Sequence, residues 1–248
     1  MITVDFNYLQ IPPDTRVLDI GCGSGRHTAA VFDLGRSFVV GADANASDLR
    51  QAGQRLHFHK QIAKQPTGTW ALSAADVTRL PFADNSFDVV ICAEVLEHIH
   101  KHHQALTELA RVLKPSGDLI ISVPRRWPER LCWALSSTYR NTPGGHIRIY
   151  RTDALIQMVR STGFRHRHTH YAHSLHVPYW WLKCLLGVER DTVWPVRLYH
   201  RFLTWDMMQQ PRLTRSLEHL LDPVMGKSLV LYFRKLRLNG QMVDSSNC

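Results

Sequence analysis

Short apolar runs recur along the chain, and several of them end in an acidic or glycine-rich turn. A run without polar alternation is typical of a strand buried on both faces of a sheet. The pattern predicts strands at residues 17–20, 38–43, 70–74, 89–92, 119–122, 164–171 and 228–233.

Apolar residues at helical spacing separate several of these strands. They predict helices at about 25–34, 48–56 and 152–163, the last capped by Thr152, and a longer one through Leu106, Leu109, Ala110 and Leu113. A Pro/Gly turn is expected at 113–117, and residues 57–69 are expected to be irregular. Strands that alternate with helices indicate an α/β fold with a doubly wound sheet.

The turn after the first strand is rich in glycine and reads Gly-Cys-Gly-Ser-Gly over residues 21–25. Glycine adopts positive φ and lets a ligand approach the backbone without meeting a Cβ. At the carboxyl end of a parallel strand, such a turn is where open α/β sheets bind nucleotide-like cofactors.

Acidic residues accompany the first three strands. Asp19 lies near the end of the first, Asp43 ends the second, and Asp76 follows the third. A carboxylate in the second position can accept hydrogen bonds from a ribose diol, and one in the third from an adenine amine. A nicotinamide dehydrogenase is the rival interpretation, but its fingerprint is G-x-G-x-x-G, whereas the glycines here run G-x-G-x-G.

This ordered set resembles the class I S-adenosylmethionine-dependent methyltransferases, in particular the small-molecule "type 11" group that includes the quinone-biosynthesis methyltransferases. The resemblance covers Arg16 to about Gly163, with the last strand near Leu229. It implies a Rossmann-like sheet of seven strands, the last of them antiparallel beside the fifth, and S-adenosylmethionine as cofactor. It leaves the acceptor open, because that group methylates O, N and C atoms.

The resemblance also implies roles for individual residues. Asp19, Gly21 and Gly23 would hold the methionine part of the cofactor, with Cys22 in the same turn and free amides at Ser24 to His27 for its carboxylate. The remaining cofactor-binding positions are Asp43 and Ala44 for the ribose and adenine, Asp76 and Val77 for the adenine amine edge, and Ala93 and Glu94 at the junction of donor and acceptor.

Two histidines are candidate catalytic residues. Glu94-x-x-Glu97-His98 is expected to place Glu94 and either Glu97 or His98 on one helix face. His146 lies in a later stretch that resembles the acceptor-pocket border of small-molecule methyltransferases. In two kinds of O-methyltransferase a similar set binds a divalent metal. A metal site, a metal-free general base at His146, and a structural hydrogen bond remain open, and eight other histidines are expected mostly at the surface or a pocket rim: His100, His102, His103, His166, His168, His170, His173 and His176.

The positive charge of the chain is concentrated in its second half. Residues 1–124 carry 11 Lys and Arg against 13 Asp and Glu, whereas residues 125–248 carry 19 against 8. A basic surface attracts anionic lipid headgroups, phosphorylated substrates or nucleic acid. Alternatively, the charge only keeps the protein soluble.

Composition favours a cytoplasmic protein. The five cysteines form no C-x-x-C pair, which predicts reduced thiols and no structural zinc. The sequence shows no signal-peptide pattern and no apolar run of the ~18 to 20 residues that span a bilayer.

We expect a single domain over residues 1–248, with a core at about 1–174 and 227–238, a helical insertion at about 175–226, and a loose tail at 239–248. Six of the 14 Trp and Tyr residues lie between 179 and 205. A lid over the acceptor pocket, a peripheral membrane contact, and a helical subdomain or dimer contact all fit this enrichment.

The predicted function is methylation of O or C on a small, hydrophobic acceptor such as a quinone, isoprenoid or lipid-linked sugar. Methylation of RNA at a 2′-oxygen and a non-catalytic subunit that binds S-adenosylmethionine are the alternatives. The oligomeric state is left open.

Overall fold

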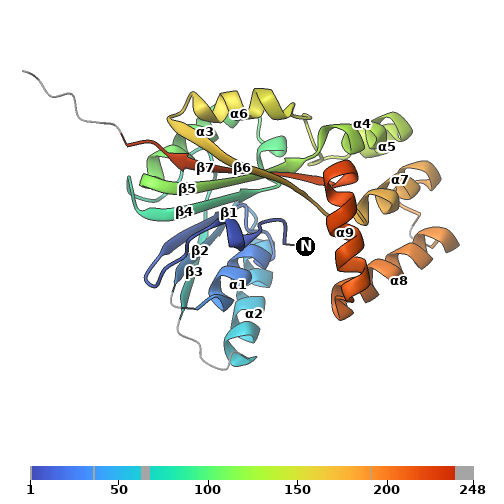
Figure 1. The fold of residues 1–248 in the computed structure, drawn as a ribbon, viewed down its shortest axis with the longest axis horizontal. Coiled ribbons are helices and arrows are strands. Elements are labelled where there is room, and N and C mark those ends of the chain that lie inside the picture. Colours follow the sequence, from blue (N-terminus) through green and yellow to red (C-terminus); the bar gives the residue numbers. More distant parts are fainter. Residues whose placement is uncertain (1, 36, 63–67, 191, 238–248) are drawn as a thin grey trace, which may run out of the picture.

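The computed structural model describes residues 2–35, 37–62, 68–190 and 192–237. A seven-stranded sheet with strand order β3-β2-β1-β4-β5-β7-β6 forms its centre (Figure 1). The strands are β1 (Arg16–Ile20), β2 (Phe38–Asp43), β3 (Thr69–Ala74), β4 (Phe87–Ala93), β5 (Leu113–Pro124), β6 (Phe164–Ala172) and β7 (Ser228–Lys235). The predicted doubly wound α/β fold is confirmed.

Strands β1 to β5 are parallel, and β7 lies antiparallel between β5 and β6. The strand order reverses between β1 and β4, so their carboxyl ends border the crevice where open α/β sheets bind ligands. The glycine-rich turn follows β1 and Glu94 follows β4, so both lie at this crevice.

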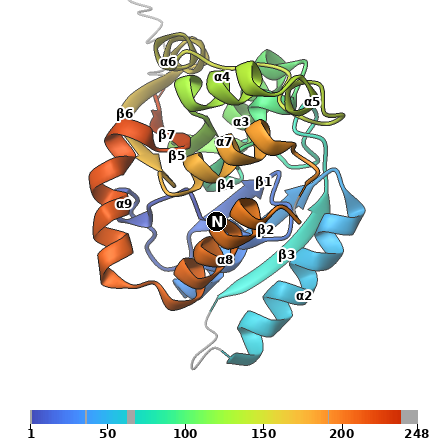
Figure 2. The same ribbon diagram turned by 90° about the vertical axis from the view of Figure 1, so that its right-hand side faces the viewer.

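Three helices connect β6 to β7: α7 (His176–Leu186), α8 (Trp194–Gln209) and α9 (Arg212–Met225). Strand β7 begins at Ser228, which pairs with Pro124 at the carboxyl end of β5. The three helices therefore lie beyond the ligand-binding end of the sheet, where α7 packs against α4 (Arg126–Leu135), which is followed by α5 (Ser137–Arg140) (Figure 2).

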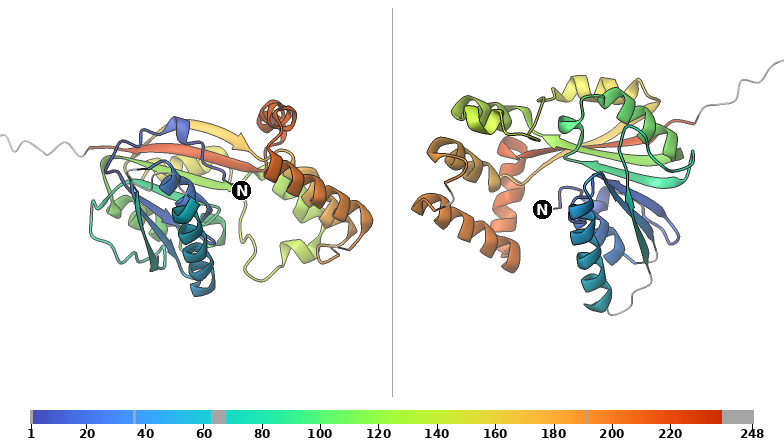
Figure 3. Two further views of the ribbon diagram at one scale, coloured as in Figure 1. Left: turned by 90° about the horizontal axis from the view of Figure 1, so that it is seen from below. Right: turned by 180° about the vertical axis from the view of Figure 1, so that it is seen from behind.

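The start of the chain lies between α1 and the helices of the insertion (Figure 3). The backbone of Asp5, just before the short helix η1 (Phe6–Tyr8), exchanges two hydrogen bonds with the hydroxyl of Tyr232, at 2.8 and 3.1 Å. The ring of Tyr8 stacks on His168 with 3.7 Å between ring centroids. These contacts attach the first residues to β6 and β7.

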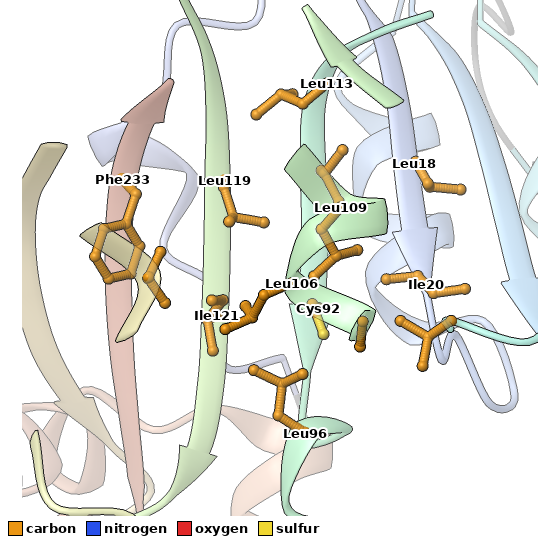
Figure 4. Close-up of a cluster of buried hydrophobic side chains, with 14 of the residues drawn as sticks. Leu18, Ile20, Cys92, Leu96, Leu106, Leu109, Leu113, Leu119, Ile121 and Phe233 are labelled. Atoms are coloured by element: carbon orange, nitrogen blue, oxygen red, sulfur yellow. The ribbon is translucent and has the colours of Figure 1, made fainter. Parts of the chain in front are cut away.

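Helices cover both faces of the sheet because alternate strand residues point to opposite sides. Val17 faces α1 (Arg26–Asp33) and α2 (Ala46–Ile62). Leu18 and Ile20 face α3 (His102–Val112) and α6 (Thr152–Arg160), in the larger apolar cluster that Figure 4 shows. The packing of both layers fixes the ends of β1 and β4, which carry the candidate site.

Several element boundaries differ from the predictions. Helix α2 continues to Ile62, where residues 57–69 were expected to be irregular. Thr152 is the first residue of α6, and the cap is Arg151. Leu113 begins β5, so the expected Pro/Gly turn is an irregularity within a strand, with Ser116 at a φ of 60°. The pairing of Leu113 with Phe87 explains this, since it draws the segment into the sheet.

The predicted loose tail at 239–248 lies outside the described residues. Within the described ranges, no helix is long and apolar enough to cross a membrane. Cys22, Cys92, Cys132 and Cys184 are buried and free of disulfide bonds.

Candidate functional site

The turn after β1 is fastened to β2 through its backbone. The amides of Gly21 and Cys22 both donate to the carbonyl of Ala42, at 2.7 and 3.1 Å. Gly21 has a φ of 67°, and a Cβ there would lie 2.3 Å from Cγ2 of Val95. At Gly23, with a φ of 51°, no atom of the described residues lies within 4 Å of a Cβ position, so this part of the backbone borders open space.

Asp43, at the end of β2, holds the turn with its carboxylate. Oδ2 accepts a hydrogen bond of 2.8 Å from the amide of Gly23, and Oδ1 accepts one of 2.8 Å from the amide of Asn45. The sequence predicted a ligand role for Asp43 and gave no indication of this structural one. Each carboxylate oxygen can accept a second hydrogen bond, so both roles are compatible.

Asp19 lies beneath the turn, and its side chain is buried. Its carboxylate accepts a hydrogen bond of 2.6 Å from the hydroxyl of Thr28 on α1. Burial raises the pKa of Asp19 to about 7, against the lowering effect of the Thr28 hydrogen bonds. This arrangement connects β1 to α1 and directs the carboxylate away from the cleft.

Two cavities meet at the glycine-rich turn, and Gly21 and Glu94 border both. The first, of about 210 Å³, is also lined by Cys22, Gly23, Ser24, His27 and Ala93. The second, of about 230 Å³, is also lined by Asp43, Ala44, Asp76, Val77 and His98. All of the predicted cofactor-binding residues except Asp19 therefore line one of the two cavities.

His27 is attached to the start of the chain. Its Nε2 atom accepts a hydrogen bond of 3.0 Å from the amide of Thr3. Burial lowers the pKa of His27 to about 4, so the ring is neutral near pH 7 and remains an acceptor.

Glu94 does not share a helix with Glu97 and His98, and the prediction of a common helix face was wrong. Glu94 has a φ of 56°, and only Leu96–His98 form a helical turn, η2. The amide of Glu94 donates to the carbonyl of Ser122 at 2.9 Å, and its carboxylate accepts a hydrogen bond of 2.8 Å from the Ser122 hydroxyl. Glu94 therefore continues the sheet, which excludes it from the helical turn.

His98 and His146 lie together, with 5.0 Å between their ring centroids. Nδ1 of His98 donates to the carbonyl of Gly145 at 3.1 Å. Nδ1 of His146 lies 2.6 Å from Oε1 of Glu129, on α4. With Nδ1 engaged in both rings, Nε2 is the atom left to accept a proton or bind a metal.

Glu129 is a site residue that the sequence analysis missed. It is 3% exposed, and its other carboxylate oxygen accepts a hydrogen bond of 3.3 Å from Tyr139. Nothing in the local sequence distinguishes it from a surface acid at the start of a helix, and His146 stands 17 residues away. Only the fold of α4 over η2 brings the two together.

Glu97 is fully buried beside this pair, and neither carboxylate oxygen has a hydrogen-bond partner within the described residues. Burial, aided by the neighbouring Glu94, raises the pKa of Glu97 well above its usual value. One potential ligand atom from each of Glu97, His98 and His146 lies within 4.8 Å of the others, whereas Glu94 is not in this group. Three of the four residues named from the sequence are thus brought together.

The segment that carries His146 is held against η2 by the residues that follow it. The amide of Ile147 donates to the carbonyl of Glu97 at 3.0 Å. Arg148 donates to the carbonyl of Ile99 at 2.5 Å, and the hydroxyl of Tyr150 to that of Leu96 at 3.2 Å. The His-x-Arg-x-Tyr stretch is therefore a positioning element for His146.

Comparisons with known proteins agree with the fold. Residues 18–121 match the family model "Methyltransferase domain". The chain is 38% identical over 120 residues to the ubiquinone/menaquinone biosynthesis C-methyltransferase of Ectopseudomonas mendocina, covering 45% of this chain and 42% of that protein. It is 34% identical over 126 residues to the ubiquinone biosynthesis O-methyltransferase of Hahella chejuensis, covering 50% and 49%.

The chain thus matches less than half of the length of these two relatives. Among solved structures, it superposes on an S-adenosylmethionine-dependent methyltransferase of Methanosarcina mazei with a TM-score of 0.58, at 17% identity, covering 93% of this chain and 95% of that one. Residues 18–121 are thus a methyltransferase domain, and the fold is that of the class I S-adenosylmethionine-dependent methyltransferases.

The residues at the cleft fit this cofactor. The backbone at Gly23 borders a space that a Cβ would enter, and the first turn of α1 begins at Arg26 without a side-chain cap. The first turn of a helix leaves amides without an intrahelical partner, which suits a carboxylate. The second cavity offers the Asp43 and Asp76 carboxylates beside Val77, a combination that suits a ribose and a base.

Proposed function

We propose that the chain is a methyltransferase that transfers a methyl group from S-adenosylmethionine to an oxygen or carbon of a small, hydrophobic acceptor. The observation that carries the proposal is the pair of cavities that meet at Gly21 and Glu94, next to the His98–His146 pair. Similarity to the quinone-biosynthesis C- and O-methyltransferases supports the small-molecule acceptor.

Binding and alignment are the main tasks of the chain. S-adenosylmethionine, when bound, supplies a methyl group that its sulfonium has already activated, and an in-line displacement needs the two partners aligned. Asp43, Ala44, Asp76 and Val77 would hold the nucleoside in the second cavity. The glycine-rich turn, with Ser24 and His27, would hold the amino-acid part in the first, so the reacting end lies near Ala93 and Glu94.

An oxygen acceptor also has to lose a proton, and His146 is the residue we assign to this step. Its Nδ1 hydrogen bond to Glu129 fixes the ring orientation and leaves Nε2 to accept the proton. The buried Glu129 carboxylate would stabilise the charged ring that results. His98, fixed by the carbonyl of Gly145, lies beside it and lines the second cavity.

A divalent metal at the same place is the second candidate, and one observation favours it. A buried carboxylate without a hydrogen-bond partner, as at Glu97, is costly unless something compensates it. Glu97, His98 and His146 offer the mixed carboxylate and imidazole ligands that suit zinc and related ions. A metal there would lower the pKa of an acceptor hydroxyl and so favour O-methylation.

We further propose that the acceptor is drawn from a membrane surface. Leu213, Leu217, Leu220 and Val224 follow one another at helical spacing on α9 and are between 41% and 81% exposed. On α8, Trp194, Leu198, Trp205 and Met208 are also exposed and share a face with Arg197 and Arg201. An amphipathic surface with aromatic and basic residues suits the interface of an anionic membrane.

Methyl transfer is tested by incubating the protein with isotope-labelled S-adenosylmethionine and a panel of quinols, isoprenoid alcohols and lipid-linked sugars, with detection of labelled product. Label in a small hydrophobic product supports the proposal. Label in added RNA, with binding that falls steeply with salt, would favour RNA methylation instead. Binding of S-adenosylmethionine without turnover on any acceptor class would favour a non-catalytic subunit.

A further inference from the structure

Two histidines and a glutamate from separate elements meet at the base of the helical insertion. His173 lies in the turn after β6, His176 begins α7, and Glu218 lies on α9. One potential ligand atom from each lies within 4.8 Å of the others. These histidines were expected at the surface or a pocket rim, and the second applies here, since both line a cavity, with His176 8% exposed and the His173 side chain 13%.

One imidazole nitrogen of each histidine in this cluster lacks a hydrogen-bond partner within the described residues. Nε2 of His173 and Nδ1 of His176 are buried, and neither has a hydrogen-bond partner within the part of the chain that the structure describes. A buried polar atom without a partner costs about 1–3 kcal/mol, and such atoms in native proteins call for an ion or water. His173 also has a φ of 67°, a conformation that non-glycine residues rarely adopt outside constrained sites.

Glu218 has one carboxylate oxygen fixed and the other directed at the histidines. Oε2 accepts a hydrogen bond of 2.8 Å from Arg215, while Oε1 lies 3.9 Å from Nδ1 of His173. Arg215 is paired as well with the buried carboxylate of Asp206.

We propose that His173, His176 and Glu218 form a zinc site that connects the end of β6 to α7 and α9. Two imidazoles and one carboxylate are a recognised zinc ligand set that leaves a fourth position open. Arg215, bonded to the second oxygen of Glu218, would orient that carboxylate from outside. All three ligands also line a cavity of about 470 Å³ between the insertion and α1, from which water or a substrate atom could complete the coordination.

The test is zinc binding by the full-length protein, measured by dialysis against Zn²⁺ and metal analysis, and by the visible absorption of a Co²⁺-loaded sample. The variants are His176→Ala and Glu218→Gln. The matched control is His219→Ala, because His219 follows Glu218 on α9 but is exposed. A second series repeats these proteins in a His98→Ala background, which removes a ligand of the other candidate cluster.

We expect His176→Ala and Glu218→Gln to bind one zinc ion fewer per chain than the parent protein of each series, and, in the His98→Ala series, to lose the Co²⁺ bands of tetrahedral coordination. The loss in affinity should exceed the roughly 10- to 100-fold that a lost outer partner costs. Unchanged S-adenosylmethionine binding would show that the variants fold. The proposal would be overturned if the wild type, His176→Ala and Glu218→Gln had equal zinc content and affinity. It would also be overturned if His98→Ala alone removed all of the bound zinc.

Discussion

Nδ1 of His146 lies 2.6 Å from the carboxylate of Glu129, a buried acid on a different helix. The contact engages Nδ1 and leaves Nε2 as the imidazole nitrogen that can accept a proton or bind a metal. It also gives the ring a negative partner that water cannot screen well, which is the arrangement a general base or a metal ligand needs.

Replacement of Glu129 tests this relationship. Glu129→Gln keeps a hydrogen-bond acceptor but removes the charge, and we expect kcat for an oxygen acceptor to fall by roughly 10- to 100-fold. KM for S-adenosylmethionine should not change, since Glu129 lines neither of the two cavities. Steady-state kinetics check this, with Glu108→Gln as control because Glu108 is paired with Arg111 on α3 and lines neither cavity. Equal kcat in both variants would show that the charge of Glu129 is irrelevant.

Two glycines of the turn should respond differently to alanine. Gly21→Ala would place a methyl group 2.3 Å from Val95, so we expect a loss of about 1–3 kcal/mol in the free energy of unfolding. Gly23→Ala meets only open space and the strain of positive φ, so its stability should fall by about 1–2 kcal/mol while cofactor affinity drops further.

Chemical denaturation and calorimetry distinguish these two effects. Val95→Ala should recover part of the stability lost in Gly21→Ala, and it should not restore cofactor binding to Gly23→Ala. An additive result for Gly21→Ala with Val95→Ala would contradict the contact that the structure shows.

Asp19 makes stability depend on pH. Its pKa is about 7 when folded and near 3.8 when unfolded, so between these values the folded state binds more protons. The stabilisation is complete below pH 3.8 and is lost as the pH rises through 7. At about 1.4 kcal/mol per pKa unit, the effect is at most a few kcal/mol.

We expect Asp19→Asn, which cannot ionise, to become more stable relative to the wild type as the pH rises from 5 to about 8. Urea denaturation of both proteins without added cofactor measures the difference. A constant difference across this range would show that Asp19 titrates normally in the folded protein.

The sequence was sufficient for the sheet and for most of the cleft because both depend on local patterns. The run before Gly21 predicts a buried strand, and the acids at Asp43 and Asp76 follow strands whose carboxyl ends meet at one edge. The sequence analysis did not predict that Asp19 is buried. Its side chain faces α1, and its partner Thr28 comes within bonding distance only when α1 packs on β1.

The histidine sites show the same limit more strongly. His98 and His146 could be named, but their partner Glu129 comes from a helix that no motif marks. His173 and His176 were expected at the surface or a pocket rim, but their meeting with Glu218 could not be predicted, since it requires α9 to fold back over the end of β6.

The exposed stripe on α9 predicts membrane binding. Leu213→Ser with Leu220→Ser should weaken binding to vesicles that contain anionic phosphatidylglycerol, because each lost apolar side chain removes about 1.5–3 kcal/mol of burial. The control is Phe58→Ser, on the exposed side of α2. Vesicle flotation provides the measurement, and equal flotation of all three proteins would place the membrane contact elsewhere.

The most direct test of the central claim is calorimetric titration of the full-length protein with S-adenosylmethionine and with NAD, repeated with Asp76→Ala. Among the residues that the structure describes, the Asp76 carboxylate bonds only to Thr78, in its own loop, so its loss should not disturb the turn that Asp43 holds. The account predicts binding of S-adenosylmethionine in the micromolar range, weakened at least tenfold in Asp76→Ala, and none of NAD. A preference for NAD, or no binding of S-adenosylmethionine, would contradict it.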